Sequence, residues 1–182
     1  MVRAEYDKSL LLMNTMRKLW EQHIMWTRSF IISTIDGLKD LDAVTARLLR
    51  NPEDFASVLR MFYGHEKANK FKELFTEHLL IAAALVNAAK AGDAKAVEVN
   101  RIKWYKNAED IAIFLSGINP YWNKNEWLIM LDDHLKMTEL EAVQRLKGQY
   151  TEDIATYAEI ENMALKMADY MAMGIKKQFK LY

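Results

Sequence analysis

LWEQHI at residues 19–24 is repeated, nearly unchanged, as LFTEHL at residues 74–79 and as MLDDHL at residues 130–135. Each copy has apolar residues four and three positions before a histidine and one position after it. At 3.6 residues per turn these positions share one face of an α-helix, so each histidine lies within the apolar stripe of its helix. Three of the four histidines are therefore predicted to face a protein interior. They are His23, His78 and His134.

Helical periodicity extends outward from these phrases over almost all of the 182 residues, and only 6 glycines and 2 prolines interrupt it. The alternating pattern of a half-buried strand does not persist anywhere. We therefore expect an all-α, up-and-down helical bundle in one domain, residues 1–182, with about five long helices and two short ones. The predicted helices cover roughly residues 7–36, 41–50, 52–62, 65–90, 93–116, 124–147 and 150–178.

Composition narrows the classes of partner and cofactor. The 25 basic and 25 acidic side chains cancel, which disfavours nucleic acid and anionic membranes as partners. The longest apolar stretch, residues 79–86, is far shorter than the ~20 residues that span a bilayer. The first residues do not resemble a signal peptide, so we expect a cytoplasmic protein. Cysteine is absent, so a bound metal would need nitrogen and oxygen ligands.

The turns between the predicted helices indicate which residues lie at the same depth. His134 and Glu161 are equally far from the turn at residues 147–148, so a helical hairpin would bring them face to face. Glu161 also interrupts an otherwise apolar stripe on the last helix. The same reasoning at the turn of residues 91–92 places His78 opposite Tyr105, with Trp104, Asn107 and Ala108 nearby on that helix.

His23, at a comparable distance before Gly37, completes a set of polar groups at the middle of the bundle. Three imidazoles and one carboxylate, from His23, His78, His134 and Glu161, would form a ligand shell for one divalent ion, Zn, Fe, Mn or Ni. Open positions on the ion would take water or a small-molecule substrate, as in metal-dependent hydrolysis or group transfer. Tyr157 and Tyr105 are the candidate catalytic proton donors.

Three acidic residues stand next to these histidines in the sequence. Glu77 and Asp133 each precede a histidine by one residue, and Glu21 precedes His23 by two. They could orient an imidazole on a neighbouring helix, as outer-shell carboxylates do, or simply face solvent. The fourth histidine, His65, begins a predicted helix and is expected to face solvent.

Two other interpretations remain open at this point. A non-enzymatic structural or interaction bundle, as a monomer or a homodimer, could use the same residues as a hydrogen-bonded polar core. Haem would need only two axial histidines, but the chain has no attachment motif and aliphatic side chains crowd the histidines. The aromatic loop at residues 118–127 is open to three roles, as a lid, a partner-binding loop or a packing clamp.

Several short strings along the chain resemble a known family. They are LWEQH at 19–23, WTR at 26–28, RLLRN at 47–51, FYG at 62–64, EHLLIA at 77–82 and FLS at 114–116. In these strings the chain is similar to a family of small bacterial helical-bundle proteins with no assigned activity. The resemblance implies an all-helical architecture and a shared site for the matched histidines. In architecture alone the site looks like that of DinB-type metal-binding bundles, some of which transfer thiols, although the histidine spacing and Glu161 depart from their pattern.

Overall fold

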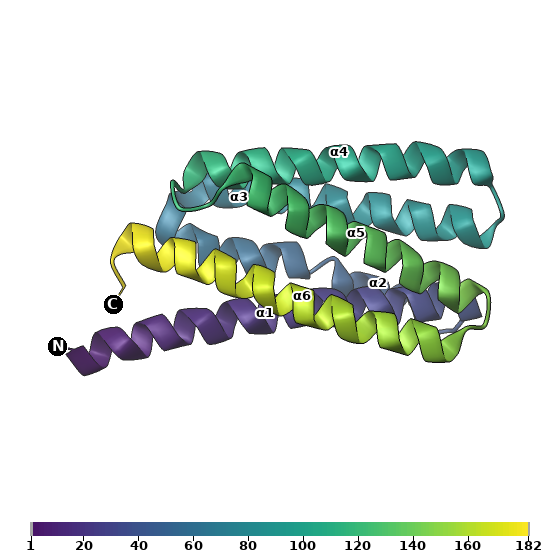
Figure 1. The fold of residues 1–182 in the computed structure, drawn as a ribbon, viewed down its shortest axis with the longest axis horizontal. Coiled ribbons are helices and arrows are strands. Elements are labelled where there is room, and N and C mark those ends of the chain that lie inside the picture. Colours follow the sequence, from purple (N-terminus) through teal and green to yellow (C-terminus); the bar gives the residue numbers. More distant parts are fainter. Residues whose placement is uncertain (1, 182) are drawn as a thin grey trace.

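The computed structural model describes residues 2–181, with side chains from residue 8 onward, and every regular element in that range is an α-helix. The all-α bundle predicted from the sequence is confirmed (Figure 1). The helices are α1 Val2–Asp36, α2 Leu41–Leu48, α3 Asn51–Lys90, α4 Ala94–Ile118, α5 Lys124–Leu146 and α6 Tyr150–Phe179.

The predicted helices 52–62 and 65–90 are the two parts of α3, which changes direction at Gly64 (Figure 1). Gly64 has a φ of 77° and a ψ of 177°, a backbone conformation that L-residues rarely adopt. The glycine therefore lets the first part of α3 cover the inner face of α1 while the second part returns along α4. Trp20 of α1 packs edge-on against Phe55 of the first part, with ring centroids 5.4 Å apart.

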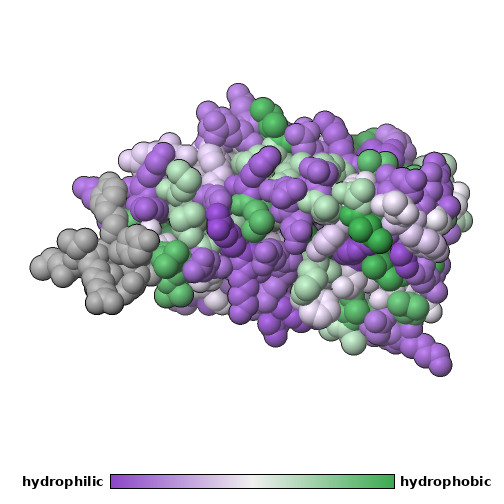
Figure 2. All heavy atoms as spheres, turned by 60° about the horizontal axis from the view of Figure 1, so that its bottom comes forward, coloured by the Kyte–Doolittle hydropathy of each residue, from purple (hydrophilic) through white to green (hydrophobic). Residues whose placement is uncertain are grey.

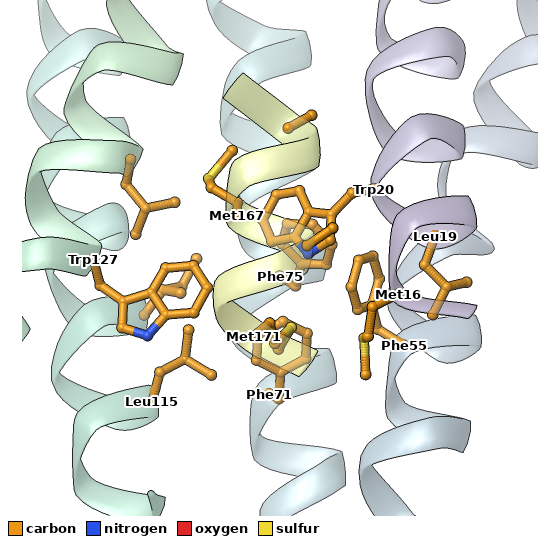
Figure 3. Close-up of a cluster of buried hydrophobic side chains, with 14 of the residues drawn as sticks. Met16, Leu19, Trp20, Phe55, Phe71, Phe75, Leu115, Trp127, Met167 and Met171 are labelled. Atoms are coloured by element: carbon orange, nitrogen blue, oxygen red, sulfur yellow. The ribbon is translucent and has the colours of Figure 1, made fainter. Parts of the chain in front are cut away.

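The long helices pack as a closed series, in which α6 lies between α1 and α5, α4 between α5 and α3, and α3 against α1. The two termini lie at the same end of the bundle (Figure 1). Aromatic and methionine side chains fill the centre, where Phe75 contacts both Trp20 and Phe55 (Figure 3). This aromatic layer joins α1 to α3 and borders His23 and His78.

The loop between α4 and α5 is anchored by a helix cap and by buried tryptophan side chains. Asn123 caps α5 by accepting hydrogen bonds from the backbone N–H groups of Asn125 and Glu126. Within the predicted loop of residues 118–127, Trp122 and Trp127 are buried, whereas Tyr121 is half exposed. The buried indoles favour the packing clamp among the three roles expected for this segment.

No helix among the described residues is both long and apolar enough to cross a membrane. Hydrophobic side chains on the face in Figure 2 form separate groups interrupted by hydrophilic ones.

Candidate functional site

His23 of α1, His78 of α3 and His134 of α5 are each only 2% exposed. The rings of His23 and His134 contact each other, with centroids 5.6 Å apart. The ring of Phe75 lies between those of His23 and His78, with its centroid 4.8 Å from His23 and 6.0 Å from His78. The prediction that these histidines face the interior is confirmed. Helices α1 and α5 bring His23 and His134 together, whereas the Phe75 ring separates His78 from His23.

All three imidazoles are neutral at pH 7. Burial, which penalises the charged form, lowers the pKa of His78 to about 4. Burial, and then repulsion from a charge on His78, lowers the pKa of His134 to about 3. Burial, followed by repulsion from His134 and His78, lowers the pKa of His23 well below its usual value, although the neighbouring Asn51 acts in the opposite direction. Neutral rings keep a nitrogen lone pair for a hydrogen bond or a metal ion.

Several polar atoms around His23 are buried without a hydrogen-bond partner. They are Nδ1 of His134 and Nε1 of Trp20, together with Nδ1 of His23 and Oδ1 of Asn51, two atoms of neighbouring side chains whose hydrogen bonding would raise the pKa of His23. The indole of Trp20 stands edge-on to the His23 ring at 5.7 Å. An unpaired buried polar atom costs about 1–3 kcal/mol, so such a concentration of them needs a functional or structural reason.

His78 differs from the other two histidines because both of its ring nitrogens have partners. Trp104 donates from Nε1 to Nε2 of His78 at 3.1 Å, and Nδ1 of His78 lies 2.9 Å from Oδ1 of Asn107. Both partners belong to α4 and are buried. The turn geometry of the sequence correctly placed these two residues beside His78.

Glu161 does not join the histidines, and the predicted inward position of this carboxylate is wrong. Glu161 is exposed and, with Glu21 and Tyr157, lines a surface hollow between α1 and α6. Its neighbour Ile160 faces the core instead and is 2% exposed. The first turns of α6 direct Asp153 inward, so the buried face is rotated by one residue from the stripe in which Glu161 was expected.

The three acids predicted near the histidines fall into two groups. Glu77 accepts a hydrogen bond from Nδ2 of Asn107 at 3.2 Å, so this carboxylate is connected to His78 through one amide. Asp133 is exposed and pairs with Lys136 at 3.7 Å, and Glu21 is also exposed. Only Glu77 has a contact that leads to a histidine.

The two tyrosines predicted as proton donors are half buried at the edges of the bundle. Tyr157 lies under the guanidinium of Arg28, which is 4.8 Å from the ring centroid. Burial and nearby carboxylates, Glu139 first among them, raise the pKa of Tyr105. A catalytic role for either tyrosine stays a prediction. His65 is exposed, as expected.

A second buried polar cluster was not predicted. Arg28 of α1 donates from Nη1 to Glu141 of α5 at 2.5 Å and to Asp153 of α6 at 2.6 Å. Both carboxylates are at most 2% exposed, and burial raises the pKa of Glu141 to about 7 against the opposing effect of Arg28. The sequence did contain a signal for this cluster, because Glu141 follows His134 by two helical turns on the same stripe.

Among the side chains of residues 8–181, no group of three or more histidine, aspartate and glutamate residues is already arranged as a metal shell. No family model, curated protein or solved structure matches the chain. The case for a function therefore depends on the geometry of the histidine cluster itself.

Proposed function

We propose that this protein binds one divalent transition-metal ion in the bundle core, with His23 and His134 as its two protein ligands. The main support is the contact between two buried neutral imidazoles, whose ring centroids lie 5.6 Å apart and of which His134 has no hydrogen-bond partner at Nδ1. A ring bound to zinc has its centroid about 3 Å from the ion, so two rings that share an ion lie within about 6 Å of each other. The observed spacing is compatible with that limit.

The ligand types favour some of the expected metals over others. With Glu161 at the surface, the cluster offers imidazole nitrogens only, which suit Zn, Ni and Fe better than Mn. Two imidazoles leave the remaining positions on the ion for water and substrate atoms. An ion held in this way would polarise a bound oxygen, so hydrolysis or group transfer on a small molecule is the chemistry we expect.

One observation favours the alternative, a structural bundle with a polar core and no bound ion. Both nitrogens of His78 are already satisfied by Trp104 and Asn107, which is the usual arrangement for a histidine that only packs. Under this alternative the unpaired nitrogens of His23 and His134 would be matched by water or by each other.

Metal analysis separates the two proposals. Protein expressed without a histidine tag is dialysed and its metal content is measured beside that of a variant with His23→Gln and His134→Gln. The control variant is His65→Gln, because His65 is exposed and is not one of the buried histidines. We expect close to one ion per chain in the parent and the control, and a large loss in the double variant. Thermal unfolding checks that each protein is folded, and metal-free parent protein would contradict the proposal.

A further inference from the structure

An apolar cavity of about 30 Å³ lies in the core where α1, α3, α4 and α5 meet. Aliphatic and aromatic side chains form most of its wall, among them Ile31, Leu79 and Trp104, which are all at most 3% exposed. A cavity of about 10–15 Å³ is enough to hold one water molecule. This cavity therefore has room for about two groups of that size.

Two threonines in the wall have their hydroxyl hydrogens engaged by the backbone. Thr27 donates to the backbone oxygen of His23 at 2.8 Å, and Thr138 donates to that of His134 at 2.8 Å. These bonds leave the threonines with no hydrogen for a molecule in the cavity. They also place the cavity within one helical turn of the two histidines whose rings contact each other.

The other polar groups of the wall offer no donor either. The indole N–H of Trp104 donates to His78 at 3.1 Å. Glu139 accepts from Nε of Arg101 at 2.9 Å through Oε2, and its Oε1 is buried where a water-sized molecule does not reach it. A buried water needs two to four polar partners, so this wall disfavours water and the cavity is expected to be dry.

A second apolar cavity, of about 40 Å³, adjoins the first. The two cavities have part of their wall in common, which consists of Leu85, Val86, Glu139 and Ala142. Val143 lines only the outer cavity and is 40% exposed, so this cavity lies closer to the surface. Together the cavities form an apolar path from the surface of α5 into the core.

We propose that these cavities bind dioxygen: the outer cavity admits it, and the inner one holds it one helical turn from His23 and His134. Dioxygen is a diatomic molecule without a hydrogen to donate, so it matches the volume of the inner cavity and loses little by leaving water. Dry apolar cavities take up small apolar molecules in this way. The binding needs no ion, whereas its relevance to the histidine pair rests on the proposed metal site.

Paramagnetic relaxation by dissolved dioxygen tests the proposal on the full, metal-free chain. Methyl NMR signals of Ile31 and Leu79, which line the inner cavity, are recorded under dioxygen and under nitrogen. The control signals are those of Ile160 and Leu131, which are also at most 3% exposed but line neither cavity. The enhancement by dioxygen should be several-fold larger at the cavity residues, because a close-packed core has no space for a guest molecule.

A variant that fills the cavities locates the bound dioxygen. Ala142 lines both cavities and is 6% exposed, so Ala142→Leu occupies the space where they meet. The enhancement at Ile31 should then fall to the level of Ile160. Ala155→Leu, the same change at an exposed position of α6, should keep the parent enhancement. Thermal unfolding checks that both variants are folded.

Equal enhancement at the cavity and control methyls of the parent would overturn the proposal, and this comparison needs no variant. Enhancement that persists at Ile31 in folded Ala142→Leu would also overturn it, because dioxygen would then act from another place. Cavity enhancement in a protein that holds no metal in the elemental analysis would support the dioxygen site and overturn the metal site alone. Metal content without cavity enhancement would overturn the dioxygen site and leave the metal site intact.

Discussion

Arg28 is the residue on which the buried charges of this bundle depend. It forms ion pairs with both Glu141 and Asp153, and Arg145 adds a weaker contact to Asp153 at 3.6 Å. Taking charges out of water is costly, so such a cluster adds little net stability compared with apolar packing, yet removing one member leaves an uncompensated buried charge. The value of the cluster is that it fixes how α1, α5 and α6 face one another.

Replacement of Arg28 by alanine should lower the free energy of unfolding by about 3–5 kcal/mol, because two buried carboxylates lose their main cation. Arg17→Ala is the matched control, since Arg17 also joins α1 to α6, through Asp169, at an exposed position. The control should cost less than about 1 kcal/mol. Urea unfolding measures both, and equal losses would contradict the role assigned to Arg28.

Helix α6 illustrates how the residues that a helix buries against the core are selected. Its buried residues follow a single stripe that begins with Asp153 and Thr156 and continues through Ile160 and Ala164 to Ile175. The hydropathy of the sequence favoured the stripe one residue later in the first turns, where Ile154 is in fact 61% exposed. The long run of core residues from Ile160 onward sets the phase of α6 and turns Asp153 inward, where the ion pair with Arg28 compensates the buried carboxylate.

The C-terminal half of α6 depends on a glycine that makes room for an indole. A Cβ added at Gly174 would stand 1.9 Å from Nε1 of Trp122. Gly174→Ala should therefore destabilise the protein by about 1–3 kcal/mol through overpacking, despite the better helix propensity of alanine. Gly117→Ala, on α4 with open space around the site, should instead stabilise it by up to about 1 kcal/mol. Thermal unfolding tests both signs, and a stabilising Gly174→Ala would show that Trp122 moves freely.

At the scale of the whole molecule, the histidines and Glu141 make stability depend on pH in opposite directions. The three buried histidines have a lowered pKa, so below about pH 6.5 they take up protons when the chain unfolds, and the stability they support is lost as the pH falls toward 4. Glu141 has a pKa raised to about 7, so it holds a proton in the folded state that the unfolded chain releases above about pH 4.5. The stability from Glu141 is thus lost as the pH rises toward 7.

The histidines outweigh Glu141, so the metal-free protein should lose stability on acidification from pH 6.5 to 4.5. A net difference of about two protons corresponds to a steepest slope of about 3 kcal/mol per pH unit. Urea unfolding at several pH values measures this slope. Glu141→Gln removes the opposing contribution and should make the fall steeper. A stability that stays constant over this range would mean that the histidines are not buried as neutral rings.

Much of this fold follows from local sequence signals. Gly64, the loop after α4 and the turn at residues 147–148 were located because glycine, proline and asparagine interrupt a strong helical period. The inward position of the three histidines and their neighbours on α4 followed from helix phase and from distances to the turns. Glu161 was misplaced and the Arg28 cluster was missed, because the stripe at the start of α6 is ambiguous by one residue and a charged side chain is buried only where a partner on another helix compensates it.

The sequence by itself determined that the chain is all-helical, where its helices end, and that His23, His78 and His134 lie on buried stripes. These properties depend on residues within a few turns of one another. Tertiary structure decided which carboxylates are buried, that both nitrogens of His78 are engaged by Trp104 and Asn107, and that those of His23 and His134 are not fully paired. Such choices depend on directional contacts between helices, and the apolar period of a single helix carries no information about them.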